Sequence, residues 1–159
     1  MSNSPEHREL VFRSLDEVVA EAERLAAGEV RTTGRHSFGQ ILEHLARTHD
    51  ITTGKVVGPS PPWFMKLIIP LMKPFIFRDR PVKPGFKLPP NAEAYFWPDQ
   101  EFDVATALEH LKESVRYYDT HGPLAKHPMF GKITREQSLS LNLRHAALHL
   151  GFVHPVSSV

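Results

Sequence analysis

Cysteine is absent from this chain of 159 residues, and neither sign of charge is in large excess. Without cysteine the protein has no disulfide, no thiolate metal ligand and no cysteine nucleophile, which leaves histidine and carboxylate groups as its coordinating side chains. Nineteen basic against eighteen acidic residues give a net charge of +1, whereas phosphate binding needs a basic face. We therefore expect no nucleic-acid partner. The absence of cysteine also agrees with the cytoplasmic location that we expect.

Long hydrophobic runs are missing as well. The N-terminus through Glu9 is polar and lacks the apolar stretch of a secretory signal. The most apolar stretch, residues 63–77, is too short for a bilayer-spanning helix and contains two lysines and two prolines. We expect neither export nor a membrane partner.

The chain is rich in histidine, and two of its ten histidines, His145 and His149, lie four residues apart in an apolar helical pattern. Positions i and i+4 share one helix face, so both imidazoles can reach one divalent cation. Burying two imidazoles without partners costs about 1–3 kcal/mol each, and a shared metal removes both costs. His44 lies in a second amphipathic pattern and is the third candidate ligand. The alternative is a chance pair of hydrogen-bonded core histidines.

Capping patterns and apolar spacing predict four helices. The four are expected to begin after Ser14, Ser37, Asp103 and Thr134, and the first three apolar patterns continue to about residues 27, 45 and 121. The last helix, residues 135–153, is apolar around most of its circumference and is expected to be the most buried. No segment shows convincing strand alternation. The predicted fold is therefore all-α, a four-helix bundle in a single domain over residues 1–159.

A long connection between the second and third helices, residues 57–98, holds ten of the fourteen prolines. Residues 63–77 within it contain eleven large apolar side chains, too many to remain solvated. We expect an irregular segment that packs on the bundle or in a homodimer interface. Trp63, Phe64 and Phe75 could also form an apolar wall of a substrate pocket.

Three motifs appear in a specific order: SFGQILEHL at residues 37–45, HPMFG at 127–131, and His145-x-x-x-His149-Leu150. Together they resemble the DinB/YfiT-like superfamily of metalloenzymes, four-helix bundles with a three-histidine site. The likeness spans about residues 8–155 and is strongest to an uncharacterised branch with an HP-x-FG loop before the last helix. The branch commonly has a tryptophan where this chain has Ser138, and often has adjacent histidines where Leu148 precedes His149.

The resemblance implies a divalent metal held by His44, His145 and His149, the same three residues that spacing selects. Related members include thiol-dependent transferases and isomerases. Three imidazoles leave coordination positions open for water, whose pKa a cation lowers towards about 7, or for a thiolate. Zinc and nickel are the favoured metals. We expect an enzyme acting on a small-molecule substrate, either a hydrolase or a transferase with a low-molecular-weight thiol cosubstrate. The alternative is a noncatalytic bundle that binds a small ligand or partner without metal.

Two further residues are candidates for supporting roles. His127, in the tight loop before the last helix, could act as an acid/base group, or could hydrogen-bond the loop backbone and fix the turn. Asn142, three residues before His145, could orient an imidazole, or could pack at a polar border of the helix. His49 lies roughly 140° around the helix from His44, which argues against shared coordination. The other five histidines have no spacing that suggests more than surface or capping roles.

Overall fold

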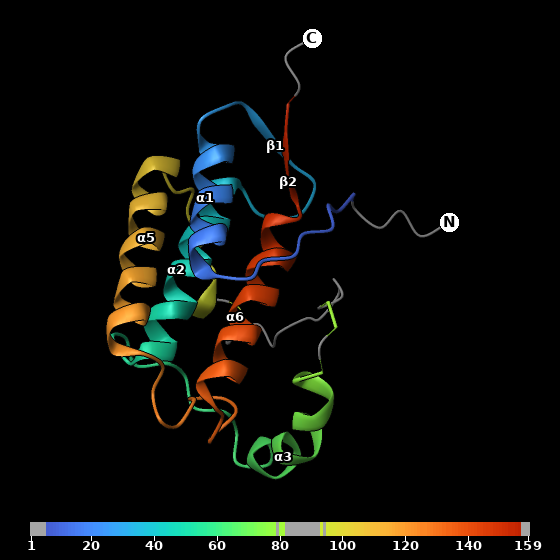
Figure 1. Ribbon diagram of the computed structural model, residues 1–159, viewed down its shortest axis with the longest axis vertical. Coiled ribbons are helices and arrows are strands. Elements are labelled where there is room, and N and C mark those ends of the chain that lie inside the picture. Colours follow the sequence, from blue (N-terminus) through green and yellow to red (C-terminus); the bar gives the residue numbers. More distant parts are fainter. Residues whose placement is uncertain (1–5, 79, 82–92, 94, 157–159) are drawn as a thin grey trace.

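The computed structural model describes residues 6–78, 80–81, 93 and 95–156, and this part of the chain is mostly helical. It confirms the all-α prediction except for a two-stranded sheet. The prediction of a connection between residues 57 and 98 falls partly outside the described residues. The elements in chain order are α1 (Leu15–Ala26), β1 (Val30–Thr32), α2 (Phe38–Thr53), α3 (Met65–Ile76), α5 (Val104–His121), α6 (Arg135–Leu150) and β2 (Val153–Pro155) (Figure 1).

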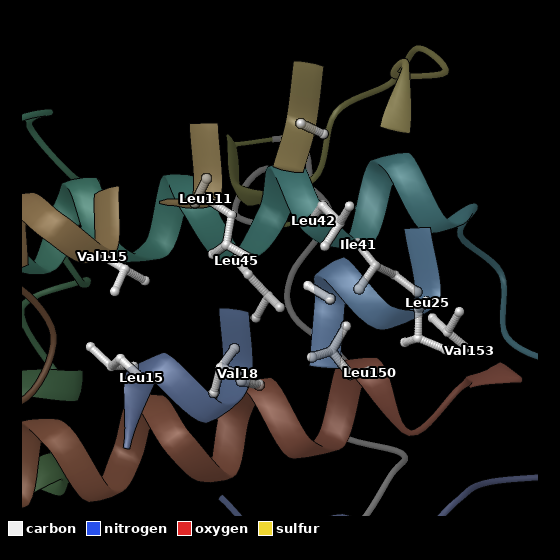
Figure 2. Close-up of a cluster of buried hydrophobic side chains, with 14 of the residues drawn as sticks. Leu15, Val18, Leu25, Ile41, Leu42, Leu45, Leu111, Val115, Leu150 and Val153 are labelled. Atoms are coloured by element: carbon white, nitrogen blue, oxygen red, sulfur yellow. The ribbon is translucent and has the colours of Figure 1, made fainter. Parts of the chain in front are cut away.

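Helices α1, α2, α5 and α6 surround one hydrophobic core, to which β2 adds Val153. Figure 2 shows side chains from these elements meeting between the helices, among them Leu25, Leu45, Leu111 and Leu150. The most buried helix is α2, with thirteen buried residues against five in α6. The expectation that the last helix is the most buried was therefore wrong. The reason is that α2 packs extensively against α5 and also contacts α6, whereas the contacts of α6 with α1 and α2 are much less extensive.

The predicted caps set the helix starts. Ser37 and Thr134 each form a reciprocal capping box, with Gln40 and Gln137. Asp103 accepts a hydrogen bond from the Thr106 amide at 2.9 Å. The box expected at Ser14 is only half formed, because Ser14 accepts from the Glu17 amide while the Glu17 carboxylate accepts from the Arg13 amide.

The last helix ends at Leu150, three residues earlier than predicted, and the chain continues into strand β2. Strand β2 pairs antiparallel with β1, with Thr32 opposite Val153. The N-terminal segment supplies hydrogen-bond donors to the carbonyls at the end of α6. The Arg8 amide donates to the Gly151 carbonyl at 2.8 Å, and the Arg8 guanidinium donates to the Leu150 carbonyl at 3.1 Å. Strands of three residues are too short to show alternation in sequence, which is why the sheet was not predicted.

The apolar segment within the long connection is a helix, α3, and not the irregular stretch expected from its prolines. Pro70 and Pro74 lie on its solvent side and each removes one i→i−4 hydrogen bond. Most residues of this segment do not pack onto the bundle, and the alternative, a homodimer interface, stays a prediction. Only Ile69 is buried, and exposed side chains cover the outer face, here named the α3 apolar face: Trp63, Phe64, Leu67, Ile68, Leu71, Met72 and Phe75.

No helix in the described part of the chain is long and apolar enough to cross a membrane. Helix α3 lies at the end of the molecule opposite the small sheet (Figure 1).

Helices α2 and α5 are joined by a histidine between two buried carboxylates. His110 of α5 approaches Glu43 through Nδ1 at 2.8 Å and Asp50 through Nε2 at 2.9 Å. Arg47 and Lys55 lie at the outer oxygens of the same carboxylates. Only the protonated imidazole can donate at both nitrogens. Burial by itself would lower the pKa of His110, but the hydrogen bonds and charges of the two carboxylates outweigh it and raise the pKa.

This arrangement predicts a pH-dependent contribution to stability. Because the pKa of His110 is raised in the folded state, its stabilisation is complete below the unfolded value of about 6.5 and is lost as the pH rises through the folded value. We expect His110→Asn to destabilise the protein by about 2 kcal/mol near pH 6 and by less near pH 9. Urea unfolding at both pH values measures this, with His121→Asn, an exposed residue at the end of α5, as the control. A larger loss near pH 9 would contradict it.

Candidate metal centre

The three histidines selected by the sequence meet between α2 and α6. His44 comes from α2, and His145 and His149 come from successive turns of α6. The Nε2 atoms of His44 and His145 are 3.1 Å apart, and those of His145 and His149 are 3.0 Å apart. Each residue offers a nitrogen within 4.8 Å of the others, so this group could hold a metal ion. Nitrogens bound to one tetrahedral zinc at about 2.0–2.1 Å would lie about 3.3 Å apart.

Hydrogen bonding fixes the tautomer of His44. Its Nδ1 lies 3.0 Å from the carbonyl oxygen of Phe96, which can only accept, so Nδ1 carries the hydrogen and Nε2 presents a lone pair. Nε2 of His145 lies within hydrogen-bonding distance of Nε2 of both His44 and His149. A neutral imidazole carries at most one hydrogen on this nitrogen. That hydrogen could serve only one of the two contacts well, whereas one cation accepts lone pairs from all three nitrogens. The donor set therefore fits a metal.

Burial keeps these imidazoles neutral, the form that binds metals. His44 is buried, and His145 and His149 are each partly buried. Burial lowers the pKa of His145 to about 4, and burial together with the neighbouring imidazoles holds the pKa of His44 and His149 well below the usual value.

Trp97 packs against the three-histidine group, a role that no pattern in the sequence indicates. Its indole stacks on the His44 ring at 3.8 Å between centroids, and His36 stacks on the opposite indole face at 3.6 Å. Trp97 also meets His149 edge-on at 5.1 Å. With the Phe96 carbonyl, it fixes the plane and direction of His44. The expectation of only a surface or capping role for His36 was therefore wrong, as it was for His110, because both make contacts with residues far away in the chain.

The structure places His127 in the loop before α6, where its own loop surrounds it. Its Nδ1 accepts from the amides of Met129 and Phe130 at 3.1 and 3.2 Å, and its backbone pairs with Gly131. Burial lowers the pKa of His127 to about 4. These contacts agree with the turn-fixing alternative. It is not among the three histidines that converge, and an acid/base role remains a prediction.

Asn142 and His49 occupy a polar part of the core. Asn142 is buried beside the hydroxyl of Tyr118, which is hydrogen-bonded to Ser138 at 3.0 Å. Its Nδ2 has no hydrogen-bond partner among the described residues. His49 is also buried, with Nδ1 donating to the Leu45 carbonyl at 2.7 Å. It lies outside the converging group, as its angle around the helix predicted.

Fold and site together define a mostly helical protein with a group of one buried and two partly buried histidines that could hold a metal ion. A family model described as a protein of unknown function, DUF1569, matches residues 4–156. The chain belongs to this family. No curated protein and no solved structure matches it.

Proposed function

We propose that this protein is a divalent-metal-dependent enzyme that acts on a small molecule, with His44, His145 and His149 as the metal ligands. The observation that carries the proposal is the convergence of three Nε2 atoms from two helices, with the His44 lone pair directed inward by the Phe96 carbonyl. Zinc and nickel suit three neutral imidazoles. When bound, either ion supplies a Lewis acid with open positions for water or a thiol.

We further propose that α1, α2, α5 and α6 form a DinB-like four-helix bundle. The motif at residues 37–45 spans the cap and first turns of α2, the HPMFG loop immediately precedes α6, and the histidine pair lies in the last turns of α6. This order and placement support the resemblance. The relatives implied by it make hydrolysis and thiol transfer the two reactions to test, the latter with a low-molecular-weight thiol as cosubstrate.

The surrounding residues orient the three histidines and shield part of the group from water. Phe96 and Trp97 hold His44 in one orientation, and their neighbours in α2 and α6 bury one side of the group. His145 and His149 are less buried than His44, and we expect a substrate to approach from their side of the group. A preorganised ligand set of this kind costs little rearrangement when the reaction takes place.

The test is activity of metal-loaded protein purified without a histidine tag. Zinc- and nickel-loaded samples are assayed against ester and amide substrates and for transfer of low-molecular-weight thiols. We expect turnover with one of these classes, and at least a 100-fold loss in His145→Ala, as is typical when a catalytic group is removed. Stoichiometric metal without any turnover would exclude these two reaction classes and leave the metal site in place. Protein that retains no metal would overturn the metal-dependent function.

A further inference from the structure

Helix α3 contacts the rest of the protein on one side. On its inner side the Ile69 side chain is buried, and the Lys73 ammonium donates to the Lys132 carbonyl at 2.7 Å. Arg144, next to His145 in α6, donates to the carbonyls of Ile76 and Arg78 at the end of α3 at 2.9 and 3.0 Å. These contacts leave the outer face of the helix exposed to solvent.

That outer face is strongly apolar. On the α3 apolar face, Trp63, Leu67, Leu71 and Phe75 are between 66% and 76% exposed. Large side chains recur there at spacings of three and four residues, which makes one continuous stripe along the helix. Soluble monomers rarely expose such an apolar patch, so the α3 apolar face is expected to be an interaction surface. The stripe lies on a single helix.

The charge distribution indicates what covers it. Residues 63–80, which contain α3, carry four basic residues, Lys66, Lys73, Arg78 and Arg80, and one acidic residue, so this segment has a net charge of +3. The Arg78 guanidinium lies 4.8 Å from the centre of the Phe75 ring, on the apolar face itself. A second copy docked through the same face would set like charges against each other. An anionic surface would be attracted.

We propose that α3 docks this protein onto anionic lipid membranes, lying in the plane of the interface with its apolar face among the headgroups. Aromatic and leucine side chains on one face with basic residues around them are the composition of such helices. Lys66, Pro70, Lys73 and Pro74 prevent α3 from spanning a bilayer, but an in-plane helix needs no such length. This inference departs from the sequence-based expectation of no membrane partner, and it does not depend on the metal.

Vesicle flotation with the full chain tests it. We expect binding to phosphatidylcholine vesicles containing about 30% phosphatidylserine at roughly 50 mM salt, and at least about tenfold weaker binding at roughly 500 mM salt or without phosphatidylserine. Leu67→Glu/Leu71→Glu should weaken binding at least about tenfold and leave the circular dichroism spectrum unchanged, because neither side chain is part of the core. Val11→Glu/Val156→Glu adds the same charge at exposed valines outside α3 and should bind as the wild type does.

Three outcomes would overturn the proposal. The first is absence of wild-type binding to the anionic vesicles. The second is equal binding by the wild type and the α3 double variant. The third is a solution mass of a dimer that Leu67→Glu/Leu71→Glu converts to a monomer, which would make the α3 apolar face a subunit interface instead.

Discussion

Replacing His149 by alanine is expected to abolish metal retention while the protein stays folded. His149 supplies one of three converging nitrogens, and two imidazoles hold a divalent ion far less tightly, so we expect the affinity to fall at least about 100-fold. Most of the folding energy comes from the apolar faces of α1, α2, α5 and α6, which His149 does not form. Elemental analysis and circular dichroism on one sample measure the two effects.

The control for this variant is His121→Ala, which removes an exposed imidazole at the end of α5. It should keep both the metal and the fold. Unchanged metal stoichiometry in the His149 variant would exclude His149 as a ligand. Unfolding of that variant would instead show that metal binding and folding are coupled.

The largest effect on stability is expected at Gly39, in the first turn of α2. Replacing a glycine inside a helix by alanine normally stabilises the protein by up to about 1 kcal/mol. Here a Cβ atom would come within 1.9 Å of the backbone carbonyl oxygen of Phe102, where no side chain can give way. We expect Gly39→Ala to lower the free energy of unfolding by about 3 kcal/mol, measured by urea unfolding.

Gly28→Ala is the matched control, because a Cβ at Gly28 meets nothing within 4 Å and its φ is not positive. Its stability should stay within about 0.5 kcal/mol of the wild type or rise. Equal stabilities for the two variants would mean that the contact between α2 and Phe102 relaxes freely. Because the same helix carries His44, we also expect Gly39→Ala to weaken metal binding.

The dense packing of α2 explains why its position matters to the site. It carries His44, contacts α5 through His110 and meets α6 at the histidine group. A shift of this helix would move one ligand relative to the other two. The buried carboxylates at Glu43 and Asp50 therefore stabilise the site indirectly, because with His110 they hold α2 against α5.

The sequence by itself determined the local structure and the identity of the converging histidines. Caps and apolar spacing act within a few residues, and they placed the starts of α1, α2, α5 and α6 correctly. The same local rule selected His145 and His149, since an i,i+4 pair shares a helix face in any fold. His44 could be chosen because its helix had an apolar face that must pack against another helix.

The tertiary structure decided what depends on contacts between distant residues. The stack of Trp97 on His44, the placement of His110 between Glu43 and Asp50, and the pairing of β1 with β2 each join segments more than fifty residues apart. Such contacts leave no periodic pattern in the chain. The exposure of the α3 apolar face could not be predicted for the same reason: apolar spacing shows that a helix has an apolar side, but only packing decides whether that side faces the core or the solvent.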